Sequence, residues 1–221
     1  MSSGKRYKFQ GSTFGVQTSL GTPKTISAIS LADPAIVSAS AHGFDVGDVV
    51  KLENIDGMTQ VDDGLFAVDT PVAAGTFALS GVDSTLYDAL VVGSPAPTAS
   101  PVVFSNFCEL TGSNQQDGAT DQEDVSTICS TAKEFEDGLP DSGTLQLDFN
   151  WAGNLAVQAA MRTARANGTK IAFKVTFPGD GGVVIMIGSV QQTSFSGQVG
   201  QVWKGSATIK LSGDIYVQAA A

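Results

Sequence analysis

Short runs in which apolar and polar residues alternate make up much of this chain of 221 residues. Alternation with a period of two predicts strands that bury one face. It is clearest at residues 144–149, 169–177 and 201–211. The side chains predicted to point inward are Leu145, Leu147, Phe149, Ile171, Phe173, Val175, Phe177, Trp203, Ala207, Ile209 and Leu211. Turns rich in Gly, Asp and Pro separate the runs, so we expect a mainly β fold, an antiparallel β-sandwich or barrel.

One segment, residues 152–167, has a helical pattern, and Gly168 follows it at a position that favours a left-handed cap. Its polar side chains crowd into one arc, and most of the remaining surface is apolar. The larger apolar set includes Leu155, Val157, Met161 and Ala164. Either this flanking helix is buried within its own subunit, or one side of it contacts a neighbouring subunit.

A change in residue composition and in the length of the apolar runs divides the chain into two predicted domains. Residues 25–99 are short β-like runs between acidic turns, which predicts a small all-β module. A stretch rich in Pro, Ser and Ala at residues 93–101 reads as a semi-rigid linker. We therefore expect a β-barrel domain formed by residues 1–24 and 100–221, with the acidic module inserted between its two parts.

A long polar segment interrupts the barrel domain at residues 111–127. It has no apolar repeat, and loops of this length inside a domain are usually functional or disordered. Its acidic residues are Asp117, Asp121, Glu123 and Asp124.

Charge is distributed unevenly along the chain, whose net charge is −10. Residues 25–99 carry ten acids against one base, and residues 100–141 carry nine acids against one base. The first 24 residues have four bases and no acid, and Lys5, Arg6 and Lys8 lie at their start. An acidic chain is not expected to wrap nucleic acid, because neutralised phosphates supply most non-specific affinity. No apolar run is long enough to span a bilayer and no signal peptide is recognisable, so we expect synthesis in a cytoplasm and no membrane anchor.

The residues needed for catalysis are scarce. The single histidine, His42, precedes a turn, where we expect it to cap the turn or pack on Phe44. Cys108 and Cys129 are expected to be free thiols. The chain has no zinc ligand set, no phosphate loop and no calcium loop of known spacing. We therefore expect neither an enzyme nor a metal or cofactor site.

The order of elements resembles the tail tube proteins of long-tailed bacteriophages, the siphophages. The resemblance covers residues 1–24 and 100–215. It is carried by the strand at 103–110, the polar loop, residues 143–149 running into the helix, the strand at 170–177, and the closing strand at 206–215. The module at 25–99, with His42, Gly43, Phe44, Gly47 and Asp48, resembles inserts of other phage structural proteins.

The resemblance implies a structural virion protein whose six copies form a ring. Rings would stack, through the loop acids and the segment of Lys5, Arg6 and Lys8, into a tube through which double-stranded DNA passes without sequence-specific binding. The helix would lie outside the barrel and help to join subunits. The implied partners are the tape measure, tail terminator and tail tip proteins, and the implied location is the virion tail after assembly in the host cytoplasm.

Two other classes remain open. A ring-forming tube protein of a contractile injection or type VI secretion system would share the architecture. A carbohydrate-binding β-sandwich would also be acidic and rich in Gly, but it would display aromatic side chains on a polar face. Here Phe149, Phe173, Phe177 and Trp203 are predicted to lie on the apolar side of their strands.

Overall fold

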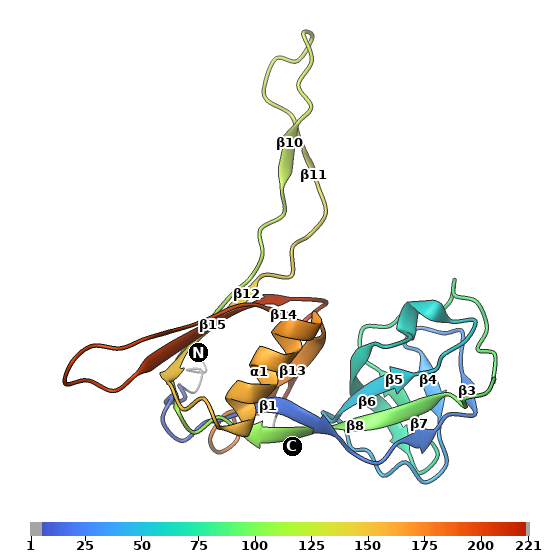
Figure 1. The fold of residues 1–221 in the computed structure, drawn as a ribbon. Coiled ribbons are helices and arrows are strands. Elements are labelled where there is room, and N and C mark those ends of the chain that lie inside the picture. The colour runs from blue at the N-terminus through green and yellow to red at the C-terminus, as the bar shows by residue number, and fades with distance from the viewer. Residues whose placement is uncertain (1–5, 220–221) are drawn as a thin grey trace.

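The computed structural model describes residues 6–219. The described chain is mainly β, with one α-helix, α1 (Ala156–Asn167), and a short 3₁₀ helix, η1 (Thr59–Val61). A curled antiparallel half-barrel, a small β-module and a protruding hairpin make up the molecule (Figure 1). The predicted fold class, an antiparallel β-barrel-like domain with a flanking helix and a β-module, is confirmed.

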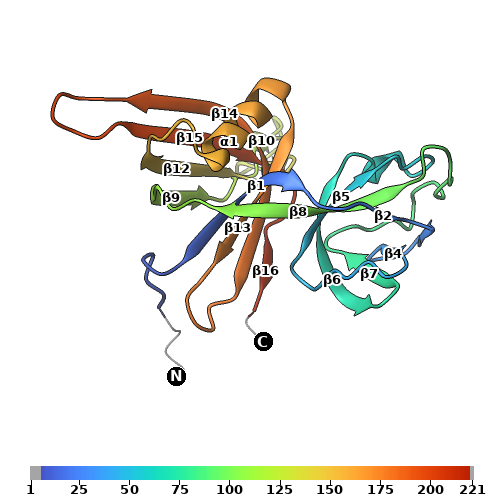
Figure 2. The same ribbon diagram turned by 60° about the horizontal axis from the view of Figure 1, so that its bottom comes forward.

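Seven antiparallel strands form the half-barrel, in the spatial order β8-β1-β13-β14-β15-β12-β9 (Figure 2). Their bounds are β1 (Thr13–Leu20), β8 (Thr98–Asn106), β9 (Leu110–Gln116), β12 (Thr144–Asn150), β13 (Lys170–Thr176), β14 (Val183–Ser196) and β15 (Lys204–Leu211). A short last strand, β16 (Tyr216–Gln218), pairs with the start of β14. The sheet is open, because its two outer strands, β8 and β9, do not pair with each other.

Helix α1 packs against β14, β1, β13 and β8 on the inner face of the half-barrel. Its side chains Val157, Met161 and Ala164 join the main hydrophobic core. The helix begins at Ala156, four residues later than predicted, because residues 153–155 form a turn and a bend instead. It ends as predicted at Gly168, whose φ is 66° and whose N–H donates to the carbonyl oxygens of Ala164 and Arg165.

The period-two pattern places most strand side chains correctly. Leu145, Leu147 and Phe149 of β12 are fully buried, and so are Ala207, Ile209 and Leu211 of β15. Two residues differ from the prediction. Ala172, which alternates with the inward-facing Ile171 and Phe173 and so is predicted to face outward, is fully buried. Trp203, predicted to face the core, is 55% exposed just before β15 begins.

The inserted module has a core of its own. Its strands are β2 (Lys24–Thr25), β3 (Ala28–Ile29), β4 (Ile36–Ser38), β5 (Val49–Glu53), β6 (Leu65–Ala73) and β7 (Thr76–Leu79). The buried residues of this second core all lie between Ile26 and Ala99. The strand order β3-β4-β7-β6-β5 continues into β8, so one hydrogen-bonded ladder runs through both parts.

Strand β8 joins the two parts and corrects the predicted linker. Residues 98–101 are not a linker, because they pair with β5 on one side and with β2 close by on the other. Residues 102–106 of the same strand then pair with β1 of the half-barrel. The Pro-rich composition of residues 93–101 predicted a linker wrongly. Pro101 lies within β8, and residues 98–100 beside it form the strand pairing with β5.

The module also packs on the outer face of the half-barrel. Val49 and Ala67 of the module bury against Ala172 and Ile185 in a third apolar cluster. The Lys174 ammonium group donates to the Gly47 carbonyl oxygen at 3.2 Å. The outer face of β13 and of the first half of β14 is therefore covered, which explains why Ala172 is buried.

A two-stranded hairpin projects far from the half-barrel between β9 and β12 (Figure 1). We call residues 117–142 the arm; it contains β10 (Gln122–Asp124) paired with β11 (Phe135–Asp137). The predicted loop at 111–127 is thus wrong in its first part, because residues 110–116 form β9 and pair with β12. The side chains of β9 from Gly112 to Gln116 are small or polar on both faces, so no alternation marked this strand.

Candidate functional site

Within residues 6–219 no group of three or more His, Cys, Asp or Glu side chains could hold a metal ion. Cys108 and Cys129 are both exposed and free. Among the described helices, none is long and apolar enough to cross a membrane.

His42 has a structural role, as the sequence predicts. It is 3% exposed, and its ring lies 5.1 Å from the rings of Phe44 and Phe77. Its Nδ1 accepts a hydrogen bond from the Phe44 backbone N–H at 3.0 Å. The neutral ring therefore carries its proton on Nε2, which donates to the Ala73 carbonyl oxygen at 2.6 Å. Both nitrogens are engaged with the backbone, so neither faces solvent as a base.

The outer face of the half-barrel is uncovered over four adjacent strands, β9, β12, β15 and the second half of β14. We call it the polar face. Uncharged side chains dominate it: Asn114, Gln116, Gln146, Gln192, Ser194, Ser206 and Thr208. Asp148, Lys204 and Lys210 supply its few charges, and Lys210 is paired with Asp141 of the arm. Most of the protein's acidity therefore lies elsewhere, on the arm and the module.

Two strand edges of the half-barrel are open within the described chain. Strand β9 pairs with β12 on one side and with no strand on the other. Residues 102–106 of β8 pair with β1 and have no strand on their other side. Open edges present unpaired N–H and C=O groups, which are templates for pairing with another chain.

The arm carries a dense negative charge. Its 26 residues, from 117 to 142, contain eight acids and one base, a net charge of −7. The four predicted loop acids, Asp117, Asp121, Glu123 and Asp124, all lie in it and are exposed. Glu123 stands directly opposite Glu136 in the ladder, an arrangement of like charges that disfavours the hairpin. Hydrogen bonds from Ser126, and then the Lys133 ammonium group, hold the pKa of Asp124 below its ordinary value of 3.8.

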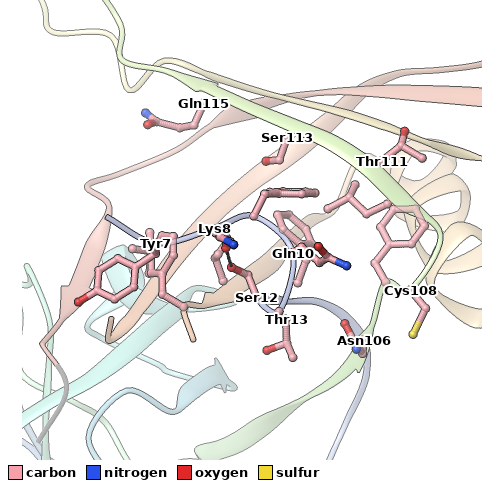
Figure 3. A pocket seen from close by; sticks show the side chains of 18 of the residues that line it. Tyr7, Lys8, Gln10, Ser12, Thr13, Asn106, Cys108, Thr111, Ser113 and Gln115 are labelled. Atoms are coloured by element: carbon pink, nitrogen blue, oxygen red, sulfur yellow. Dashed lines mark hydrogen bonds between the residues drawn. The ribbon is translucent and has the colours of Figure 1, made fainter. Parts of the chain in front are cut away.

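A groove lies beside the N-terminal segment, residues 7–12 (Figure 3). Its volume is about 770 Å³, and its floor is apolar, formed by Phe14, Phe107, Val175, Phe177, Val184 and Met186. The Tyr7 ring packs 5.9 Å from Phe177, and its hydroxyl lies 3.4 Å from the Asp180 carbonyl oxygen. The polar residues Thr111, Ser113 and Gln115 of β9 line one side of the groove (Figure 3).

The predicted contact segment is only partly described, since Lys5 lies outside residues 6–219. Arg6 and Lys8 are exposed. No ion pair joins either of them to an arm carboxylate of the same chain, among the residues that the structure describes. The structure does not bring the two predicted contact sets together within one copy.

The four predicted interface residues of the helix have different environments. Val157, Met161 and Ala164 are at most 5% exposed and lie in the subunit's own core. The subunit's own core therefore covers these three side chains, and the interface role of the helix stays a prediction. Leu155 alone, at 39% exposure, is accessible.

Sequence reasoning missed an exposed aromatic cluster at the β14–β15 hairpin. The Trp151 and Phe195 rings stack at 4.6 Å, and Trp203 lies 5.8 Å from Phe195. Phe195 is 58% exposed and Trp203 55%. Phe195 and Trp203 lie next to the loop of the hairpin. There the alternation of apolar and polar residues no longer indicates which side chains are buried.

No family model matches this chain, and no curated protein matches it either. The geometry of the half-barrel and the arm, together with the sequence pattern, is therefore the basis for a functional proposal.

Proposed function

We propose that this chain is the major tail tube subunit of a long-tailed bacteriophage. In this proposal six copies form a ring, and rings stack into the tube through which double-stranded DNA leaves the virion. The subunit assembles in the host cytoplasm and ends in the virion tail. The tape measure, terminator and tip proteins are its partners in the assembled tail.

The open half-barrel with its uncovered polar face is the observation that carries the proposal. A sheet whose two outer strands each keep an open edge lacks the closure by which barrels remove their edges. Pairing between copies would close several half-barrels into one larger barrel. The polar face would then be available to line a channel.

The composition of the polar face suits the passage of DNA. Strong non-specific binding requires several cations that neutralise phosphates. This face has two lysines, and Lys210 is already paired with Asp141. Its amide and hydroxyl groups would let a duplex slide past without holding it.

The arm supports stacking of rings. Its length carries it well beyond the half-barrel, and its charge of −7 suits a basic surface on another copy. Arg6 and Lys8, which form no ion pair with an arm carboxylate among the described residues of their own chain, are the cations that we assign to that contact.

A carbohydrate-binding module is the second candidate, because Phe195 and Trp203 are exposed together. Aromatic side chains with an apolar face and a polar edge are common at binding surfaces. Titration calorimetry with soluble polysaccharides tests it, and Trp203→Ala should abolish any heat signal if the cluster binds sugar.

Negative-stain electron microscopy of the concentrated protein tests the proposed function. The matched variant replaces residues 119–140 by Asn-Gly, a sequence that closes tight hairpins. This keeps β9, β12, Gly118 and the Asp141–Lys210 pair, and the removed residues are almost all exposed. We expect tubes from the intact protein, single rings or monomers from the variant, and the same thermal unfolding midpoint for both. An intact protein that stays monomeric at every concentration contradicts the proposal.

A further inference from the structure

We propose that the tip of the arm of one copy binds in the groove beside the N-terminal segment of another copy. This inference rests on the proposed function and adds to it the receiving surface and the apolar anchor. The occupant of the groove is thus a second copy of this chain.

The groove has the character of a binding site for an acidic, partly apolar segment. Its volume of about 770 Å³ falls in the range of ligand pockets. The lining includes Lys8 and contains no Asp or Glu. In a chain with 22 acids and 12 bases, a lining with a lysine and no acid is a surface that an acidic segment can approach without repulsion.

The arm is a hairpin that lacks a covering partner in the single copy. A two-stranded hairpin is marginally stable in water on its own. Here β10 and β11 share three residue pairs, one of them Glu123 opposite Glu136. Near the tip, Ile128 is fully exposed, at 106%, and along the arm Leu139 is 90% exposed. A contact that buries Ile128 would therefore order the hairpin and remove apolar surface from water.

Charge complementarity selects the groove as the receiving surface. The arm has a net charge of −7. Lys8 lines the groove, and the exposed Arg6 lies two residues before it. The acidic strands of an incoming arm would meet these cations while its tip meets the apolar floor.

The contact must join different copies. The arm leaves the sheet directly after β9, whose Gln115 lines the groove, and it then rises away from the half-barrel (Figure 1). About 12 residues in each direction, at roughly 3.3 Å per residue, carry the tip about 40 Å outward. A tip at that distance contacts a groove one copy further along. Because arm and groove are different surfaces, the contact is head-to-tail and repeats without closing, as a stack of rings requires.

The two native cysteines report on this contact without any added mutation. Cys108 lines the groove, Cys129 follows Ile128 at the tip, and both thiols are exposed and free. A short bis-maleimide added to the assembled protein should link Cys129 of one copy to Cys108 of the next. We expect a ladder of covalent dimers, trimers and longer species on a denaturing gel.

Two single variants establish which thiols react. Cys108→Ser and Cys129→Ser should each give no covalent oligomer alone, whereas an equal mixture of the two should give dimers and nothing longer. Ile128→Ser should reduce the yield of covalent oligomers at least tenfold. Leu86→Ser, which removes an equally exposed apolar side chain from the module, should leave it unchanged.

The outcomes separate the inference from the proposed function. Tubes that form without a ladder, or dimers that persist in Cys108→Ser through paired Cys129 thiols, overturn the inference and leave the tube function standing. If native mass spectrometry detects a small molecule bound to the protein and no covalent ladder forms, the inference is also overturned. A protein that never assembles overturns both.

Discussion

The ammonium group of Lys210 donates to the carboxylate of Asp141, so a core strand of the half-barrel holds the base of the arm. The same carboxylate accepts a hydrogen bond from the Gly143 N–H at 2.9 Å. Both interactions favour the charged form, and the bond from Lys210 contributes most. The pKa of Asp141 is therefore held below its ordinary value of 3.8.

This lowered pKa predicts how the base of the arm responds to acid. The stabilising contribution is fully present above pH 3.8 and is lost as the pH falls through the lower pKa of the folded protein. In NMR titrations we expect the Gly143 amide signal to shift with a midpoint below 3.8. Asp141→Asn should abolish that transition, and Asp148→Asn should leave it in place. A Gly143 midpoint at or above 3.8 would contradict the assignment.

Gly205 makes room for the Phe149 ring, which predicts the effect of a single methyl group. A Cβ at Gly205 would collide with the ring of Phe149, which is 1% exposed. Gly205→Ala should therefore lower the free energy of unfolding by about 1–3 kcal/mol. Gly75, whose Cβ position is open, provides the control, and Gly75→Ala should change stability by less than about 0.5 kcal/mol. Urea unfolding followed by tryptophan fluorescence measures both; equal values for the two variants would contradict the packing argument.

The burial of Ala172 predicts a strong effect from a charge at this position. Ala172→Glu places a carboxylate between the module and the half-barrel, in a cluster with Val49 and Ile185. We expect a loss of more than about 3 kcal/mol in unfolding free energy and faster proteolysis between the two parts. Gln146→Glu introduces the same side chain on the polar face and should be nearly neutral. A tolerated Ala172→Glu would show that the module does not pack there.

The hydrogen bonds of His42 predict that its replacement lowers stability and leaves assembly unchanged. His42→Phe keeps a ring beside Phe44 but leaves the Ala73 carbonyl and the Phe44 N–H unpaired. We expect a loss of about 1–3 kcal/mol in unfolding free energy, measured by urea denaturation. Assembly seen by electron microscopy should be unchanged below the unfolding temperature. Loss of assembly in a fully folded variant would instead assign His42 a direct role.

The candidate site was predicted in its parts but not in its arrangement. The acids from Asp117 to Asp124 and the basic segment were visible as charge runs, because charge is a property of composition. The acid-free groove was invisible, because its lining comes from the N-terminal segment, the end of β8, and strands β9, β13 and β14. The role of the helix was left between two alternatives, since amphipathic pattern alone does not say which chain covers an apolar face.

The sequence by itself determined the features that depend on local periodicity and local conformation. The buried face of β12, the helix end at Gly168 and the turn-capping His42 are of this kind. Only the tertiary structure decided the pairing of the polar strand β9, the burial of Ala172 and the exposure of Trp203. Each depends on whether a segment distant in sequence covers that position, and neighbouring residues along the chain carry no signal of such contacts.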